Sequence, residues 1–312
     1  MFGRLIRVSI VDKQGNSIVL VDSVNRNYND YRCNGTIDRF SGSQMDCLTL
    51  SIFNLDPVIR GELAVQTYNR VIVEFGYKDE GGILTTIFDG TIRRPQHKRT
   101  DVVTDETVIY AYDSGNFKTY GFYSKTYYDG ANFYDIAQDV AKNGNVKISS
   151  ALSEKLKNYK VKGSKSFYGS QDEILNDLAK ESGLSYKTEN NVARIFDKNE
   201  DLEDVIWFTR EVENNSIVSA SGLIGIPTLE SDGLNIECLI NPQIKIYSRI
   251  GVSNSIISVK QNGQTPNVEA GGQFNASGIY RITKMSIYFS NDGEQNSMTL
   301  KAVSNDLYSR SY

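Results

Sequence analysis

Short runs of alternating apolar and polar residues dominate both ends of this 312-residue chain. In residues 5–10, for example, Ile6, Val8 and Ile10 alternate with the residues of the opposite face. Because successive side chains of a strand point to opposite faces, this pattern predicts β-strands. Further runs of this kind occupy residues 71–77, 83–94, 106–113, 205–210, 216–221, 233–240, 243–252, 279–289 and 296–303. Closely spaced strands with few helices indicate a mainly β protein built on barrels or sandwiches.

The middle of the chain has a different period. Residues 131–144 place apolar side chains on one helical face, and Gly144 ends the pattern. A second helix is predicted after Ser170, which has capping-box spacing to Glu173. Residues 184–188 and 192–197 then indicate a hairpin that turns at residues 190–191. We therefore predict a small α+β insert at residues 127–204, between β domains at residues 1–126 and 205–312.

The two β regions resemble each other in the order of their segments. An alternating strand ends in residues 55–59 (LDPVI) and another in residues 240–244 (INPQI). The next strand opens with residues 70–73 (RVIV) in the first region and with residues 249–252 (RIGV) in the second. A long strand and a last strand then follow in both regions. The shared order favours a duplicated β domain, and two unrelated β domains are the alternative.

Nothing in the sequence indicates catalysis. His97 is the only histidine and lies in the basic stretch 93–99, where neighbouring cations disfavour its protonation. No G-x-S-x-G nucleophile motif is present. Cys33, Cys47 and Cys238 lack metal-site spacing, so we expect three reduced thiols in a protein made in a cytoplasm. We expect no enzyme activity and no metal site.

The charge pattern excludes several other classes of protein. The net charge of −4 is too small to indicate nucleic-acid or membrane attraction, and no apolar run is long enough for a membrane helix. The acidic stretch 201–204 lacks the oxygen ligands and central glycine of a calcium loop, so it is interpreted as a solvated linker. No dinucleotide or phosphate-binding glycine motif occurs, and no cofactor is expected.

One apolar segment is unusual. Leu223, Ile224, Ile226 and Pro227 lie among glycines, in a stretch that we expect to be a loop between strands. Exposed loops are normally polar, because their backbone faces water. Either this segment folds back under its own domain, or another chain covers it; we favour a subunit interface.

Residues 221–228 (SGLIGIPT) and 233–244 (GLNIECLINPQI) resemble a stretch of bacteriophage tail baseplate hub proteins. That family is related in fold to the late-control D and VgrG hubs of contractile injection machines. Ile246 stands where the family pattern has a second proline. In architecture the resemblance covers nearly the whole chain.

The resemblance implies two tail-tube-like β-barrel domains flanking the α+β insert. A homotrimer would then present six barrels as a pseudo-six-fold ring in the virion, assembled in the host cytoplasm. It would join the tail-tube protein above to the central spike protein below, among other baseplate proteins. DNA would pass transiently through the bore, without membrane insertion. The alternative is a glycan-binding or cell-wall-active tail protein that acts through the middle α+β unit.

Overall fold

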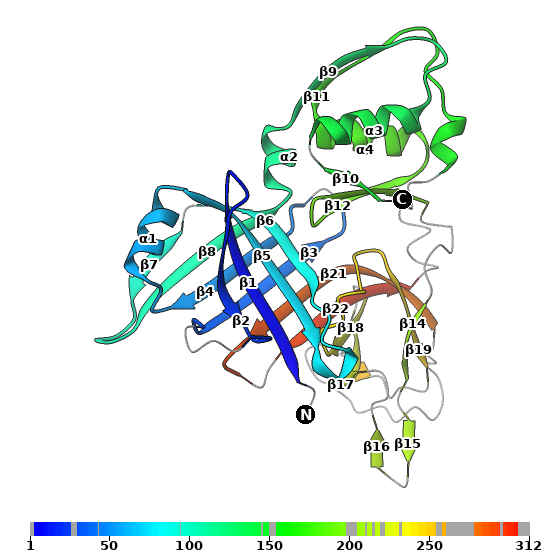
Figure 1. Cartoon of the computed structure of the whole chain (residues 1–312). Helices are drawn as coiled ribbons and strands as arrows, with labels where there is room; N and C mark the ends of the chain where they lie inside the picture. Colours follow the sequence, from blue (N-terminus) through cyan, green and yellow to red (C-terminus); the bar gives the residue numbers. More distant parts are fainter. Residues whose placement is uncertain are drawn as a thin grey trace. The chain divides into compact units, whose positions relative to one another are not determined.

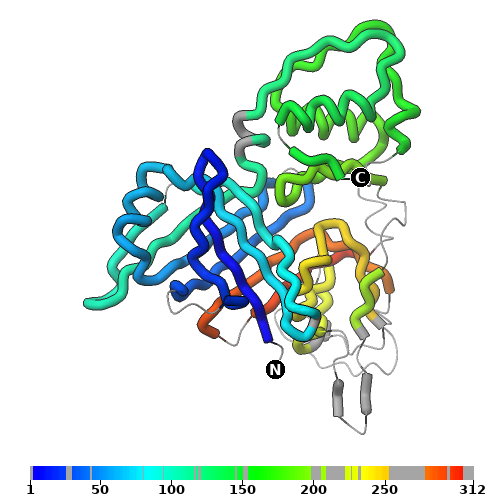
Figure 2. Tube along the Cα trace, viewed as in Figure 1, coloured from blue at the N-terminus to red at the C-terminus, as the bar shows by residue number. Residues whose placement is uncertain are grey.

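The computed structural model divides into two compact units (Figures 1 and 2). The first unit comprises residues 1–31 and 42–201, and the second comprises residues 32–41 and 202–312. Both are rich in strands, so the mainly β prediction is confirmed. The three-domain division at residues 126/127 and 204/205 stays a prediction. The structure describes residues 3–25, 30–42, 44–93, 95–144, 146–149, 154–197, 205–209, 211–213, 216–218, 222–230, 233–253, 258–259, 278–293 and 296–304.

The first unit contains an antiparallel sheet with the strand order β2-β1-β5-β6-β8-β4, and β7 also pairs with β8. Alternation of side chains builds its buried face: Val8, Ile10, Val71, Val73 and Phe75 are all fully buried. The strands are β1 (Arg4–Asp12), β2 (Ser17–Asp22), β4 (Cys47–Phe53), β5 (Tyr68–Tyr77), β6 (Thr85–Ile92), β7 (Gln96–Arg99) and β8 (Asp105–Asp113).

Short helical segments accompany this sheet. Helix α1 (Pro57–Ala64) begins at Pro57, and the side chain of Asp56 accepts a hydrogen bond of 2.7 Å from the amide of Val58. Proline suits the first helical position because its missing N–H would have no partner there. A single 3₁₀ turn, η1 (Lys78–Glu80), follows β5.

The α+β part of the first unit packs around its own apolar core. Helices α3 (Phe133–Asn143) and α4 (Gln171–Glu181) lie between a two-stranded ribbon, β9–β11, and a three-stranded sheet ordered β10-β13-β12 (Figure 1). The elements are α2 (Gly115–Tyr120), β9 (Phe122–Tyr127), α3 (Phe133–Asn143), β10 (Lys147–Ile148), η2 (Glu154–Asn158), β11 (Lys165–Ser170), α4 (Gln171–Glu181), β12 (Ser185–Glu189) and β13 (Val192–Phe196).

Both predicted helices are confirmed. The predicted face of α3 is buried, and the side chain of Asn132 caps the helix by accepting from the amide of Asp135 at 2.8 Å. Ser170 caps α4 by accepting from the amide of Glu173 at 3.1 Å. The hairpin turn is also where the sequence predicts it: Asn190 and Asn191 have φ of 52° and 57°, the left-handed values of a type I′ turn.

A buried polar contact connects the α+β part to the first sheet within this unit. The Nζ atom of Lys187 donates to Oδ1 of Asp46 at 2.6 Å, and their side chains are 1% and 0% exposed. Beside this pair, the carboxylate of Asp113 accepts from the amide of Asn190 at 2.7 Å and from that of Asn191 at 3.4 Å. The side-chain amide of Asn190 also donates to the carbonyl of Thr86 at 3.3 Å. The hairpin tip is therefore held by the side chain of Asp113 and the backbone carbonyl of Thr86.

The second unit is a mixed sheet ordered β3-β21-β22-β18-β17-β20, in which β19 also pairs with β21 and β14 with β19. The β14–β19 and β17–β20 pairings are parallel, and a separate ladder joins β15 to β16. The strands are β3 (Cys33–Phe40), β14 (Ile206–Thr209), β15 (Glu211–Glu213), β16 (Ser216–Val218), β17 (Leu223–Glu230), β18 (Gly233–Cys238), β19 (Arg249–Ser253), β20 (Ser258–Val259), β21 (Gly278–Ser290) and β22 (Ser297–Ser304).

Strand β3 comes from the N-terminal part of the sequence but belongs to the second unit. It pairs antiparallel with β21 from Asn34↔Ser290 to Phe40↔Lys284. The amide of Cys33 donates to the side chain of Asn291 at 2.8 Å, which holds the start of the strand. Gly35 is needed in this register, because a Cβ there would lie 2.5 Å from the ring of Phe289.

The predicted strand at 243–252 is wrong in its first half, since only β19 from Arg249 onward is extended. Residues 242–243 and 246–247 lie in turns. The side chain of Asn241 accepts from the amide of Gln243 at 3.0 Å, and Tyr247 has a left-handed φ of 72°. Asparagine side chains that bond to the backbone two residues on stabilise turns in place of strands.

The two units share a four-stranded motif. In the first unit, β5 pairs with β6, β6 with β8, and β8 with β4. In the second, β19 pairs with β21, β21 with β22, and β22 with β18. All six pairings are antiparallel. They join the same segments whose order the two β regions share in the sequence. The described pairings do not join the end strands of either unit's sheet into a closed barrel, so barrel closure remains a prediction.

Candidate assembly surface

The segment with Leu223, Ile224, Ile226 and Pro227 is not the loop that its glycines and proline predict. It forms strand β17, which pairs with β18 on one side and β20 on the other. The register shifts between Ile224↔Glu237 and Thr228↔Asn235, so residues 225–227 form a bulge. Gly222 and Gly225 have left-handed φ values of 71° and 68°, which glycine adopts without strain.

The bulge decides where these side chains go. Leu223 faces Cys238 across the ladder and is 8% exposed, and Pro227 is buried. Pro227 has no N–H to offer a ladder, so a bulge tolerates it. Ile224 is half-buried opposite Glu237, and the side chain of Ile226 lies outside the described residues. The chain itself covers two of the four residues, and their assignment to a subunit interface stays a prediction.

His97 lies on the exposed strand β7, with its Nδ1 atom 3.0 Å from the hydroxyl of Thr107. Burial, and then the nearby charge of Arg60, lowers the pKa of His97. The neighbouring cations are paired with carboxylates: Lys98 with Glu106 at 2.8 Å and Arg99 with Asp105 at 3.4 Å. These ion pairs offset the positive charge that a phosphate-binding surface requires.

The cysteines and carboxylates do not form a metal centre in the part of the chain that the structure describes. None of the three cysteines is in a disulfide; Cys33 and Cys238 are buried and Cys47 is half-buried. Burial, and then the charge of Glu237, raises the pKa of Cys238 to about 12, so this thiol stays protonated. The acidic stretch 201–204 lies outside the described residues. Among those described, no helix has the length and apolar character needed to cross a membrane.

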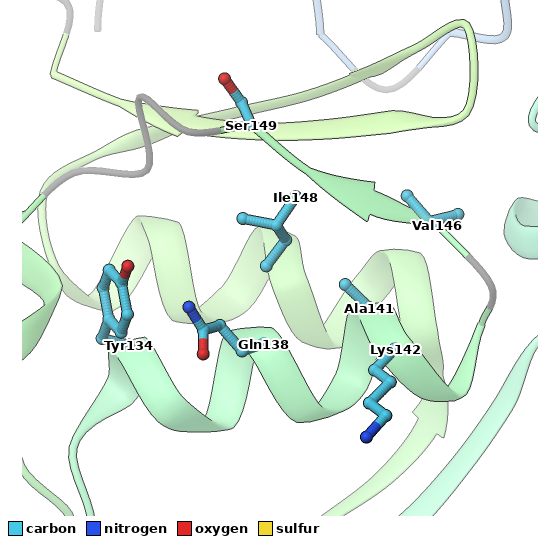
Figure 3. A pocket seen from close by; sticks show the side chains of 7 residues that line it. All are labelled: Tyr134, Gln138, Ala141, Lys142, Val146, Ile148 and Ser149. Carbon is cyan, nitrogen blue, oxygen red and sulfur yellow. The ribbon is translucent and has the colours of Figure 1, made fainter.

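A pocket of ≈ 360 Å³ lies on the α+β part between helix α3 and strand β10 (Figure 3). Its walls combine apolar groups with a phenol, an amide, a hydroxyl and one ammonium group. No carboxylate lines it, so it lacks the acid pair of a glycoside hydrolase. The lining residues are Tyr134, Gln138, Ala141, Lys142, Val146, Ile148 and Ser149.

No local pattern in the sequence predicts the buried contact at Lys187. A lysine in a hairpin next to Asn-Asn is normally solvated, and its partner Asp46 is 141 residues away in the sequence. Burial lowers the pKa of Lys187, while the facing charge of Asp46 opposes that shift. Patterns among neighbouring residues therefore could not predict this contact.

Comparison with known proteins identifies the family. The baseplate hub gp41 family matches residues 24–264, which is most of the chain. The chain belongs to the baseplate hub gp41 family.

The hub protein is also similar in fold to two phage tail proteins of solved structure. The tail protein of Neisseria meningitidis MC58 has a TM-score of 0.57 at 10% identity, with 98% of each chain covered. The 43 kDa tail protein of prophage MuSo2 from Shewanella oneidensis has a TM-score of 0.58 at 11% identity, with 97% of the hub protein and 99% of that chain covered.

A more distant likeness extends to secretion machinery. The Francisella PdpA–VgrG complex contains a chain with a TM-score of 0.52 at 10% identity; 98% of the hub protein aligns with 58% of that chain. No curated protein sequence matches the hub protein. The family resemblance predicted from residues 221–244 is confirmed, and so is the expectation of a structural protein instead of an enzyme. The hub protein is a baseplate component of a phage-like tail.

Proposed function

We propose that the hub protein forms a homotrimeric ring of pseudo-six-fold symmetry, which joins the tail tube to the central spike and lets DNA pass. The observation that carries this proposal is the shared motif: β5-β6-β8-β4 in one unit and β19-β21-β22-β18 in the other. A chain that holds the same sheet twice presents two similar surfaces. Three such chains around an axis present six, which matches a six-fold tube above a three-fold spike.

The proposed partners follow from this arrangement. They are the tail-tube protein on one side, the spike protein on the other, and further baseplate proteins around the rim. The solved complex of PdpA with VgrG supports a hub that works in contact with other proteins. A net charge of −4 suits a bore that DNA crosses without being retained, because fixed cations would hold phosphates.

The interface role of Leu223, Ile224, Ile226 and Pro227 is part of the same proposal. Ile224 is the member with described, partly open surface, and it stands next to the bulge. Bulges bend an edge and re-aim the neighbouring side chains. In a ring, this would turn Ile224 toward the adjacent copy, with Leu223 and Pro227 supporting it from beneath.

The test is the mass of the purified protein by light scattering at several concentrations. We expect a trimer of three times 34.9 kDa and a six-lobed projection of the particle by electron microscopy. If the protein is monomeric, the tail-tube and spike proteins are added separately. A protein that stays monomeric with both partners does not form the ring.

A further inference from the structure

The ribbon β9–β11 has an outer face that nothing in the described chain covers. The register pairs Phe122 with Ser170, Ser124 with Tyr168, and Thr126 with Ser166. Five of these six side chains are exposed, and Ser170 is half-buried. We call these three rungs the outer face of the ribbon.

Two aromatic rings dominate this face. Phe122 is 54% exposed and Tyr168 is 77% exposed, although apolar ring surface in water is unfavourable. Their centroids are 4.8 Å apart and their planes meet at 84°, so each ring supports the other. Most of the surface of each ring remains open.

The rest of the outer face consists of hydroxyl groups. Ser124, Thr126, Ser166 and Ser170 surround the rings, and the hydroxyls of Thr126 and Ser166 are 2.8 Å apart. Each hydroxyl can donate one hydrogen bond and accept two. No rung carries a charged side chain, in a chain in which 23% of residues are charged.

The opposite face holds the ribbon rigidly. Tyr123 and Phe167 are buried in the α+β core. The Oδ2 atom of Asp139 on α3 accepts from the hydroxyls of Tyr123 at 2.8 Å and Tyr127 at 2.5 Å, and also from Nζ of Lys125. A rigid surface loses little conformational entropy when a ligand binds, which favours affinity from a small contact area.

We propose that the outer face of the ribbon binds an uncharged carbohydrate. A sugar ring has apolar C–H faces that pack against aromatic rings, and rim hydroxyls that exchange hydrogen bonds with serine and threonine. Charge complementarity favours this ligand, because a face without charge gives no compensation for burying an ionic group. Thr126 and Ser166 already pair with each other, and Ser170 caps α4, but each hydroxyl keeps further capacity for hydrogen bonds. A protein partner with an aliphatic surface would bury that remaining capacity unsatisfied, at a cost for each group.

The experiment titrates the full-length protein with two uncharged probes, cellohexaose and a hexamer of β-1,4-linked N-acetylglucosamine, by isothermal calorimetry. We expect one probe to bind, and Tyr168→Ala to raise its Kd about tenfold, since one stacking ring is lost. Tyr168→Phe should bind as the wild type does, because the ring is kept. Tyr128→Ala is the matched control: Tyr128 is 75% exposed but lies outside the three rungs, and its loss should leave the Kd unchanged.

Hydrogen exchange with the binding probe gives a second readout that needs no variant. Protection should increase at residues 122–127 and 165–170. Absence of binding by either probe, or equal binding by Tyr168→Ala, overturns the proposal. A change of oligomeric mass in Tyr168→Ala without sugar binding also overturns it, and assigns the face to contact between copies. Sugar binding does not depend on the trimeric ring, so the two proposals fail separately.

Discussion

Replacing Lys187 by methionine is expected to loosen the hairpin β12–β13 by several kcal/mol. Lys187 and Asp46 are 2.6 Å apart with 1% and 0% of their side chains exposed. At an effective dielectric constant of about 20, two unit charges at ~3 Å attract by about 5–6 kcal/mol. Desolvating two ions costs a similar amount, so the pair as a whole contributes little. Lys187→Met removes the attraction but leaves Asp46 desolvated, and the expected loss is about 3–5 kcal/mol.

Hydrogen exchange read by mass spectrometry on the full chain is the suitable assay, because it reports each unit separately. The amides of Asn190 and Asn191 donate to Asp113 beside the ion pair, so peptides covering residues 185–196 should lose protection. Peptides covering residues 279–289 of the second unit should not change. The exchange rates convert directly into a free energy of local opening.

Two further variants make the reasoning refutable. Lys187→Met combined with Asp46→Asn removes both charges of the pair, and should recover much of the loss because Asp46 is no longer a buried charge without its lysine. Lys165→Met breaks the ion pair between Lys165 and Glu181, in which the two side chains are 37% and 47% exposed. Its loss should lower the free energy of local opening by less than about 1 kcal/mol. If Lys187→Met costs no more than Lys165→Met, or if the double variant is no better than the single one, the argument from burial is wrong.

Three other predictions test separate parts of the molecule. The hydrogen bond from Lys125, followed by that from Tyr127, lowers the pKa of Asp139 from 3.8 to about 2. The ionised carboxylate therefore stabilises the folded ribbon above pH 3.8, and this stabilisation is lost as the pH falls through 2. In the wild type, amide protection of the ribbon should decrease as the pH falls through this window. If protection in Asp139→Asn depends on pH as steeply as in the wild type, Asp139 is not the group responsible. Gly35→Ala should lower the unfolding free energy of the second unit by about 1–3 kcal/mol, because the added Cβ would overlap the ring of Phe289. The fluorescence of the chain's single tryptophan reports the resulting fall in the urea midpoint, and an unchanged midpoint would count against the register. Ile224→Lys should reduce the trimer fraction in light scattering, whereas Val19→Lys, at a site 48% exposed in the first unit, should not; equal effects would remove Ile224 from the interface.

Local patterns predicted the local structure of this chain. The face of α3, the cap at Ser170 and the Asn190–Asn191 turn were all readable because each depends on residues within a few positions of one another. The segment at 222–230 was misread as a loop. Its glycines and Pro227 are loop-forming residues, but a bulge gives them a place inside a strand.

Long-range pairing could not be predicted in the same way. No strand was predicted at residues 33–40, and alternation within a strand does not say which strand is its neighbour. The partner β21 begins at Gly278, and the sequence division had placed these two segments in different domains. Burial of Lys187 depends equally on a distant residue, Asp46. The candidate interface at residues 223–227 was chosen from its apolar composition alone. Which of its side chains are exposed depends on how β17 pairs with β18.

Strand β3 also sets the order in which the protein can be completed during synthesis. Asp38 accepts a hydrogen bond of 2.7 Å from Ser286, and these residues are 248 positions apart. At about 5–20 residues per second, the ribosome needs roughly 12–50 s to supply that partner. During this interval the first unit can fold, while residues 33–40 still lack β21. A chain that stops before residue 284 cannot pair them with β21, so only a fully translated molecule completes its second sheet.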